Sequence, residues 1–271
     1  DYGINSFLYN PAATVLEWQS RDFISSVITY PANINAYLFA YSLELATDKN
    51  KNFLKKDTNL LNSADNTNKI RFTFFNTMLK SDNIIQNYII GQEVFKTDNT
   101  VNYYAAQIGF NVSSIYNNFL YGFNIKQYSE QNAGYKDDCI LFDLGLMYKD
   151  FVIDDLNLAV SALNLVGRLN FVGASEKITQ VFGTGLKYTI NRLDFFADLK
   201  KYGDLSPKYA LGVNFRFSDN FHIMTGYNSL KNINSAVTIG LAYIDNNFGV
   251  QYAYDSFGEI RIALYNHLFK F

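Results

Sequence analysis

The feature that most constrains this chain is an alternation of apolar and polar residues with a period of two. From Lys208 to Phe217, one set of alternate positions is largely aromatic or aliphatic, and the other set is small, polar or charged. Successive side chains of a β-strand point to opposite faces, so this pattern predicts a strand with one apolar and one mixed face. Similar alternation runs through residues 118–126, 139–149, 193–200 and 248–255. The sequence therefore predicts an all-β fold.

About fourteen alternating segments follow one another along the chain, separated by turn-forming residues. They start near residues 20, 34, 69, 101, 118, 139, 154, 178, 192, 207, 220, 235, 247 and 258. Many are about ten residues long, and at roughly 3.3 Å per residue and a tilt near 45° they cover about 23 Å of height. The apolar band of an outer-membrane barrel is about 25 Å tall. We therefore predict a 14-stranded antiparallel transmembrane β-barrel over residues 20–271.

The expected connections between these strands differ in length at the two ends. Those after even-numbered strands are mostly very short, at 114–117, 150–153, 191, 218–219 and 245–246. Those after odd-numbered strands are more often longer, at 81–100, 130–138 and 165–177. Bacterial barrels have short periplasmic turns and longer external loops, which agrees with this parity. Residues 46–68 are the exception, and we expect this long polar stretch to be a periplasmic insertion.

A soluble β-sandwich would also alternate and turn at short intervals. Fourteen strands would require two sandwiches, however, and no Pro/Gly/Ser linker divides the chain. The longest unbroken apolar run, at 36–41, is far shorter than the roughly 20 residues of a spanning helix. Aromatic residues at the ends of the apolar faces are typical of membrane-interface girdles, which favours the barrel. We expect Asp1 to lie near a mature N-terminus from which an export signal has been removed.

Composition excludes several other functions. One Cys cannot form a disulfide framework, and one Cys with two His cannot supply a zinc cluster. A net charge of −2 without strong clustering of Lys and Arg argues against nucleic acid as a partner. His222 and His267 stand alone, without the neighbouring nucleophile that a catalytic triad needs. We therefore expect a non-enzyme that uses no cofactor and no metal.

In a membrane barrel the apolar face meets lipid and the mixed face lines the lumen. The predicted lumen-lining residues carry both signs of charge or are small: Lys126, Asp143, Gly145, Lys187, Asp194, Asp198 and Arg216. Because buried charges are costly unless matched, we expect them to pair across the lumen, which disfavours an open porin. Glycine on this face either admits another backbone or relieves crowding in a curved sheet. The first explanation predicts that residues 1–19 form an N-terminal plug, or hatch.

Three local motifs and the chain end point to a known family. Residues 7–13 read Phe-Leu-Tyr-Asn-Pro-Ala-Ala, residues 142–148 contain Asp-x-Gly-x-x-Tyr, and residues 160–167 end in Asn-Leu-Val-Gly. Phe269 and Phe271 alternate at the end of the chain. Together these features resemble the PorV/PorQ group of outer-membrane proteins and, more distantly, the FadL long-chain fatty-acid transporters. The resemblance implies a hatch motif at Asn10, Pro11 and Ala12, and an assembly signal at Phe269 and Phe271.

The resemblance also implies a location in the bacterial outer membrane and two different functions. PorV-like proteins act as adaptors or shuttles, or as envelope-complex subunits, that bind secreted or surface proteins in type IX secretion, and this is our first hypothesis. FadL-like proteins transport hydrophobic small molecules such as long-chain fatty acids through a lateral opening, and this is the alternative. The expected partners are outer-membrane lipid, the barrel assembly machinery, and either secreted proteins or a hydrophobic ligand in the lumen.

Overall fold

The computed structural model describes residues 9–16, 21–30, 34–46, 69–132, 134–171, 174–229, 236–244, 248–255 and 260–266, except for 91–92. Three sequence predictions lie largely or wholly outside these residues. They are the insertion at 46–68, of which only Ala46 is described, the assembly signal at Phe269 and Phe271, and most of the segment 1–19. No helix in the described part of the chain is long and apolar enough to cross a membrane.

Strands make up most of the described chain. A short 3-10 helix, η2 (Pro11–Leu16), precedes them. The strands are β1 (Arg21–Tyr30), β2 (Ile34–Ala46), β3 (Lys69–Ile90), β4 (Glu93–Tyr116), β5 (Phe119–Asn132), β6 (Tyr135–Tyr148), β7 (Leu156–Leu163), β8 (Arg168–Phe171), β9 (Ala174–Lys177), β10 (Val181–Ile190), β11 (Leu193–Tyr202), β12 (Lys208–Arg216), β13 (Phe221–Asn228), β14 (Ala236–Ile244), β15 (Phe248–Asp255) and β16 (Ile260–Asn266). The all-β prediction is confirmed.

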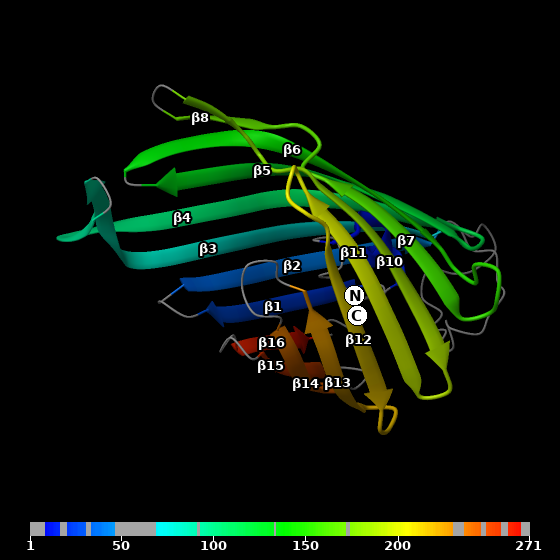
Figure 1. Cartoon of the computed structure of the whole chain (residues 1–271). Coiled ribbons are helices and arrows are strands. Elements are labelled where there is room, and N and C mark those ends of the chain that lie inside the picture. The colour runs from blue at the N-terminus through cyan, green and yellow to red at the C-terminus, as the bar shows by residue number, and fades with distance from the viewer. Residues whose placement is uncertain are drawn as a thin grey trace.

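The strands form one large antiparallel sheet that curves around an interior (Figure 1). Each strand from β2 to β7 pairs with its predecessor, and β10 to β16 continue in the same way. Strand β10 pairs directly with β7. Strands β8 and β9, which lie between β7 and β10 in the sequence, form a separate two-stranded sheet. Strand β1 pairs with β2 on one side and with β16 on the other.

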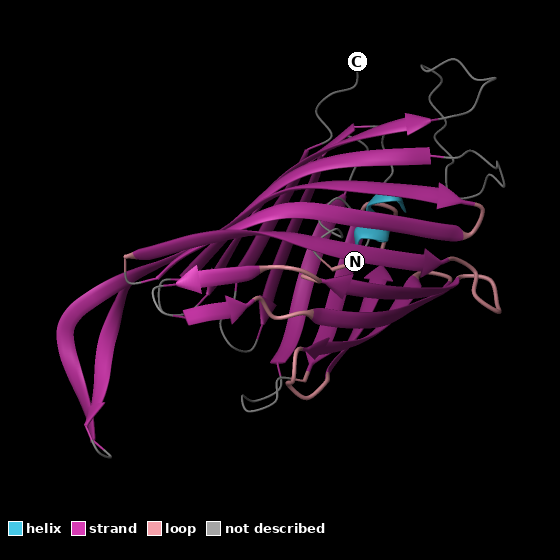
Figure 2. Ribbon diagram, turned by 90° about the horizontal axis from the view of Figure 1, so that it is seen from above, coloured by secondary structure: helices cyan, strands magenta, loops and turns pink. Residues whose placement is uncertain are grey.

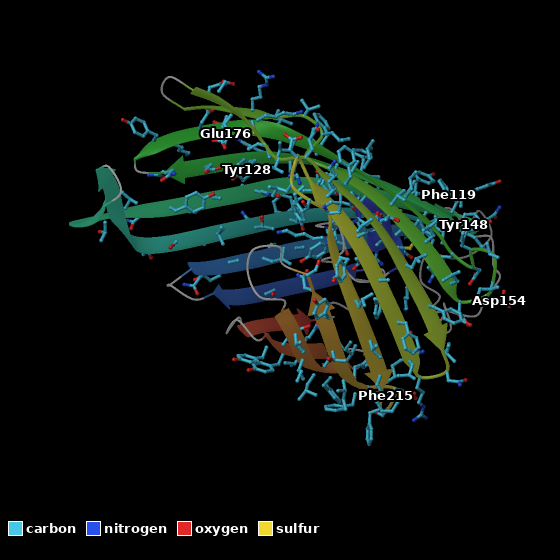
Figure 3. The ribbon with its side chains drawn as sticks, viewed as in Figure 1. Phe119, Tyr128, Tyr148, Asp154, Glu176 and Phe215 are labelled. Atoms are coloured by element: carbon cyan, nitrogen blue, oxygen red, sulfur yellow. The ribbon has the colours of Figure 1, made fainter. Side chains whose placement is uncertain are left out.

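The two faces of the sheet have the polarity that the alternation predicts. Along β5, exposed and buried residues alternate strictly from Phe119 to Gln127. The exposed outer positions carry aromatic and aliphatic side chains, while Asn124 and Lys126 are buried on the inner face. Figure 3 shows Phe119 and Tyr148, which are cross-strand partners, at the end of the sheet that holds Asp154. The distribution is the reverse of that in a soluble protein, whose large apolar side chains are mostly buried.

At the end of the sheet that holds Asp154, the connections predicted at 114–117, 191 and 218–219 are short in the structure, whereas the one predicted at 150–153 extends over residues 149–155. Strands β4 and β5 are joined at Asn117 and Asn118, and strands β10 and β11 at Asn191 and Arg192. Asn117 has a φ of 52° and Asn191 a φ of 54°, in the left-handed region that Asn tolerates better than most residues. The connection at 245–246 lies outside the described residues.

The longer loops predicted at the opposite end are wrong in their boundaries. Residues 81–100 are mostly strand, because β3 continues to Ile90 and β4 begins at Glu93 (Figure 2). The β3–β4 ladder has register shifts between Ser81 and Ile84 and between Ile85 and Asn87. Such irregularities add or remove a residue on one strand, so a period-two pattern is lost although the strands continue. The remaining loops shrink too: residues 130–132 and 135–138 belong to the paired strands β5 and β6, and 165–177 contain β8 and β9.

We expect the left-handed turn residue Asn191 to contribute measurably to stability. Changing Asn191→Val places a β-branched side chain at a positive φ and should lower the free energy of unfolding by about 1–2 kcal/mol. Asn191→Gly, which carries no such penalty, is the matched control and should be as stable as the natural chain. Urea unfolding of the reconstituted protein measures both, and equal midpoints for the two variants would contradict the prediction.

Candidate functional site

The N-terminal segment, defined here as Tyr9–Leu16, lies against the inner face of the sheet. The Asn10 side-chain amide donates to the backbone carbonyls of Leu146, at 3.1 Å, and Val160, at 3.2 Å, which are cross-strand partners in β6 and β7. The Asn10 Oδ1 accepts a hydrogen bond from the Ala12 amide at 3.0 Å. Asn10, Ala12 and Ala13 are all buried. One side chain therefore both attaches the segment to two strands and shapes its turn.

A row of small residues on the inner wall receives this segment. Its members are successive cross-strand partners in β4, β5, β6, β7 and β10, namely Ser113, Gly122, Gly145, Ser161 and Gly183. A Cβ atom at Gly122 would collide with the Pro11 carbonyl, and one at Gly145 with Oδ1 of Asn10. Close backbone approach is therefore the reason for glycine at these two positions. At Gly212, by contrast, the nearest atoms to an added Cβ are 3.7 Å away.

A buried carboxylate, Asp143 in β6, organises the polar side chains beside this row. The Nζ of Lys126 lies 2.8 Å from its Oδ2, and the Asn124 amide donates to the same oxygen at 2.8 Å. Its other oxygen, Oδ1, accepts from the Asn164 backbone N–H at 2.8 Å. Lys126 and Asp143 were predicted to line the interior, and the structure brings them together.

Asn111 connects this group to the N-terminal segment. Its side-chain amide donates to Oδ1 of Asn124 at 2.8 Å and to the Pro11 carbonyl at 3.1 Å. Sequence reasoning missed both asparagines, although they occupy inward positions in the same alternation as Lys126. An amide at an inward position of a strand is the signal that would have found them.

A second ionic group lies on β10, β11 and β12. Asp194 is 3.7 Å from Lys187 and 3.6 Å from Arg216, and it accepts hydrogen bonds from Thr189 at 2.8 Å and Asn214 at 3.0 Å. The structure therefore brings together three of the predicted residues, with Lys187 and Arg216 beside the carboxylate of Asp194.

The predicted pairing across the lumen is wrong for these charges. Lys126 and Asp143 lie on adjacent strands of one wall, and so do Lys187 and Asp194. Neighbouring strands are only about 4.8 Å apart, so a lysine reaches a carboxylate on the next strand without crossing the interior. Asp198 lies apart from both groups, on the inner face of β11 opposite Gly185.

A third ionic group was not predicted. Arg71 in β3 is fully buried, and its guanidinium lies 3.0 Å from Glu44 in β2 and donates to the Ser42 hydroxyl at 2.9 Å. Lys69 also lies 3.4 Å from the Glu44 carboxylate. Glu44 and Arg71 are direct cross-strand partners, and that register is not readable from the sequence.

The N-terminal segment also contacts β11, which follows β7 and β10 in the strand order of the sheet. The Nζ of Lys200, on β11, lies 4.4 Å from the centroid of the Tyr9 ring, a cation–π geometry. The segment thus extends from the β4–β7 wall to β11. Asn10 and Pro11 thus lie against the inner face of the sheet, and the hatch role that the resemblance implies for Asn10, Pro11 and Ala12 stays a prediction.

The strand pairing of the wall is interrupted beside β6. Strand β6 pairs with β5 along its whole length. On its other side, only residues 144–148 of β6 pair with β7. The chain leaves the wall after Leu163, and residues 164–180, here called the β7–β10 segment, follow (Figure 1). Gly167, at a φ of 140°, lies against Leu141 and Cys139 of β6. In the described part of the chain, residues 135–141 of β6 form a ladder with β5 but with no strand on the opposite side.

The amino-acid sequence matches no protein-family model and no curated protein. Among solved structures, the chain is similar to the TodX monoaromatic hydrocarbon channel, as a deltaS2 mutant, with a TM-score of 0.54 and 12% identity over 96% of this chain and 91% of that one. The likeness to TodX is one of fold. The CymD monoaromatic hydrocarbon channel aligns with a TM-score of 0.45 and 11% identity, over 97% of this chain and 91% of CymD. A mutant Rh. blastica porin aligns with a TM-score of 0.43 and 9% identity, over 91% of this chain and 99% of the porin.

We expect glycine at position 122 to be necessary for the placement of the N-terminal segment. Gly122→Val should displace the segment, because the added side chain occupies the space of the Pro11 carbonyl. Hydrogen exchange at the Ala12 and Ala13 amides should then accelerate by about tenfold or more, as expected for the loss of one or two buried hydrogen bonds. Gly212→Val is the matched control on the same inner face and should leave those amides protected. Unchanged exchange in Gly122→Val would contradict the prediction.

Proposed function

We propose that the chain forms a closed fourteen-stranded β-barrel in the bacterial outer membrane and transports hydrophobic small molecules, in the manner of a FadL-like transporter. The observation that carries the proposal is the fold likeness to TodX, which is described as a monoaromatic hydrocarbon channel and is matched over 96% of this chain. The order of paired strands supports a closed barrel, because it leads from β1 through β16 back to β2 and β1.

The exposed outer face supports a membrane location. Outward positions of the strands carry Phe, Tyr, Leu and Ile, while the ionic groups described above lie inside. In water this surface would be a large exposed apolar area, which soluble proteins avoid. In a bilayer the same side chains contact lipid, and the strand backbone remains satisfied by its neighbours. Contact with the assembly machinery through Phe269 and Phe271 stays a prediction.

The interior favours a selective route over a general pore. We take the N-terminal segment, which is hydrogen-bonded to the inner face of β6 and β7, to act as a plug, and the charges pair between neighbouring strands. A route for an apolar solute then leads past this segment and toward the lipid beside residues 135–141 of β6, where the strand ladder is interrupted. Lateral movement of this kind is what the FadL resemblance implies.

The transporter is favoured over the adaptor that the sequence suggested first. The supporting structure is that of a hydrocarbon channel, whereas the PorV-like role in type IX secretion rests on the sequence resemblance. Purification from native membranes in mild detergent distinguishes the two hypotheses. Recovery of the barrel with stoichiometric secreted or envelope proteins would support the adaptor, whereas recovery of the barrel alone would favour the transporter.

We expect the barrel to increase uptake of apolar solutes by intact cells. The experiment expresses the chain in a Gram-negative host that lacks its own hydrocarbon channels and measures uptake of radiolabelled naphthalene and oleate. Uptake of at least one should rise several-fold over cells with an empty vector. Uptake of labelled sucrose, which a general porin would admit, should not change. Equal uptake of both apolar probes with and without the protein would contradict the proposal.

A charge on the outer face should oppose membrane insertion in proportion to its depth. Leu211 lies within β12 and is 53% exposed, and Leu205 lies in the β11–β12 connection and is 60% exposed. Leu211→Arg should destabilise the inserted barrel by about 2–4 kcal/mol, and Leu205→Arg by no more than about 1 kcal/mol. Reversible unfolding from lipid vesicles measures both. An equal, small effect at the two positions would place Leu211 outside the apolar band.

A further inference from the structure

We propose that Asp143 is a positioning residue that couples the N-terminal segment to the β7–β10 segment, so that displacement of one loosens the other. The role given to this coupling, coordinated opening of the lumen and of the wall beside β6, rests on the proposed transport function. The coupling itself rests on contacts that link Asn111, Asn124, Asp143 and Asn164, and it is measurable without transport.

The connection to the N-terminal segment runs along one cross-strand row. Asn111, Asn124 and Asp143 are direct partners in β4, β5 and β6. Each asparagine amide donates to the next residue of the row at 2.8 Å, and the Asn111 amide also donates to the Pro11 carbonyl at 3.1 Å. Asn111 and Asn124 are at most 1% exposed. The row therefore joins the segment to Oδ2 of Asp143 through buried hydrogen bonds alone.

The connection to the β7–β10 segment begins at the other carboxylate oxygen. Oδ1 of Asp143 accepts from the backbone N–H of Asn164, the first residue after β7. Asn164 has a φ of 57°, and its side-chain amide donates to the Thr179 carbonyl at 3.0 Å. Asp143 thus holds the residue at which the chain leaves the wall, and that residue ties together the two ends of the β7–β10 segment.

The burial of Asp143 makes the two connections interdependent. The residue is 1% exposed, and its oxygens are occupied by Asn124, Lys126 and Asn164. A buried carboxylate that loses one of three partners keeps its full desolvation cost, so the remaining bonds must hold it alone. If the N-terminal segment moves, the Asn111 amide loses the Pro11 carbonyl and the row shifts. If Asn164 moves, the carboxylate is free to rotate away from Asn124.

A second buried carboxylate, Asp194 in β11, is the control that distinguishes coupling between the two segments from a general contribution to stability. Asp194 is also buried, accepts from an asparagine on the next strand and lies near cations. Its described partners belong to β10 and β12, and none of them lies in the N-terminal segment or the β7–β10 segment. Asp194→Asn therefore removes a comparable charge without touching either end of the proposed coupling.

The test is residue-resolved hydrogen exchange on the barrel in lipid nanodiscs, read at Ala12 and Ala13 and at Asn164 and Leu165. Asn111→Ala removes the donor to Pro11 but leaves the Asp143–Asn164 bond intact. The coupling predicts about threefold to tenfold faster exchange at all four amides. Asp143→Asn should accelerate the same four amides, and Asp194→Asn should accelerate none of them.

Two results would overturn the coupling. One is faster exchange in Asn111→Ala at Ala12 and Ala13 only, which would make the two segments independent. The other is equally faster hydrogen exchange at the four amides in Asp194→Asn and Asp143→Asn, which would mean that Asp143 only contributes to the general stability of the barrel. If Asp143→Asn fails to fold, Asn111→Ala with the Asp194→Asn control decides alone. Faster exchange at all four amides in a protein that takes up neither naphthalene nor oleate would reject the transport function and leave the coupling standing.

Discussion

The inversion of the sheet, with apolar side chains outside and polar ones inside, is the constraint on which the rest of the structure depends. Every inward polar group has to find its partner within a limited interior, because unpaired buried groups cost free energy. For the inward charges, the structure does so by grouping them around single carboxylates: Glu44, Asp143 and Asp194 each accept from or pair with two or more donors. The N-terminal segment is paired in the same way, since the Asn10 side-chain amide donates to the Leu146 and Val160 carbonyl oxygens of β6 and β7.

Those parts of the fold that depend on local pattern were predictable from the sequence. The faces of β5, β6 and β12 follow from period-two alternation, and the turns at Asn117 and Asn191 follow from residues that tolerate a positive φ. The long β3–β4 hairpin was not predictable in this way. Two register shifts interrupt its alternation, so the strand pairing continues where the pattern stops.

Some members of the candidate site were predictable from the sequence, but Asn111, Asn124 and the pairs that the residues form were not. Alternation placed Lys126, Asp143 and Gly145 on the inner face, and the family resemblance pointed to Asn10 and its neighbours. Which residues meet depends on the register between strands and on where β7 ends, and neither is a property of one segment. For that reason the charges were expected to pair across the interior, whereas they pair within one wall.

Pairing within the wall has a consequence for what holds the N-terminal segment. On the β4–β7 side, several buried hydrogen bonds and two glycines fix residues 10–13. On the β11 side, the described contact is that of Lys200 with the Tyr9 ring, a type of interaction that contributes only about 0.5–2 kcal/mol. Had the ionic groups bridged the interior, they would hold both walls and the segment together. Because they do not, the described hydrogen bonds that join residues 10–13 to the sheet all come from the β4–β7 wall, the same wall whose strand ladder is interrupted beside β6.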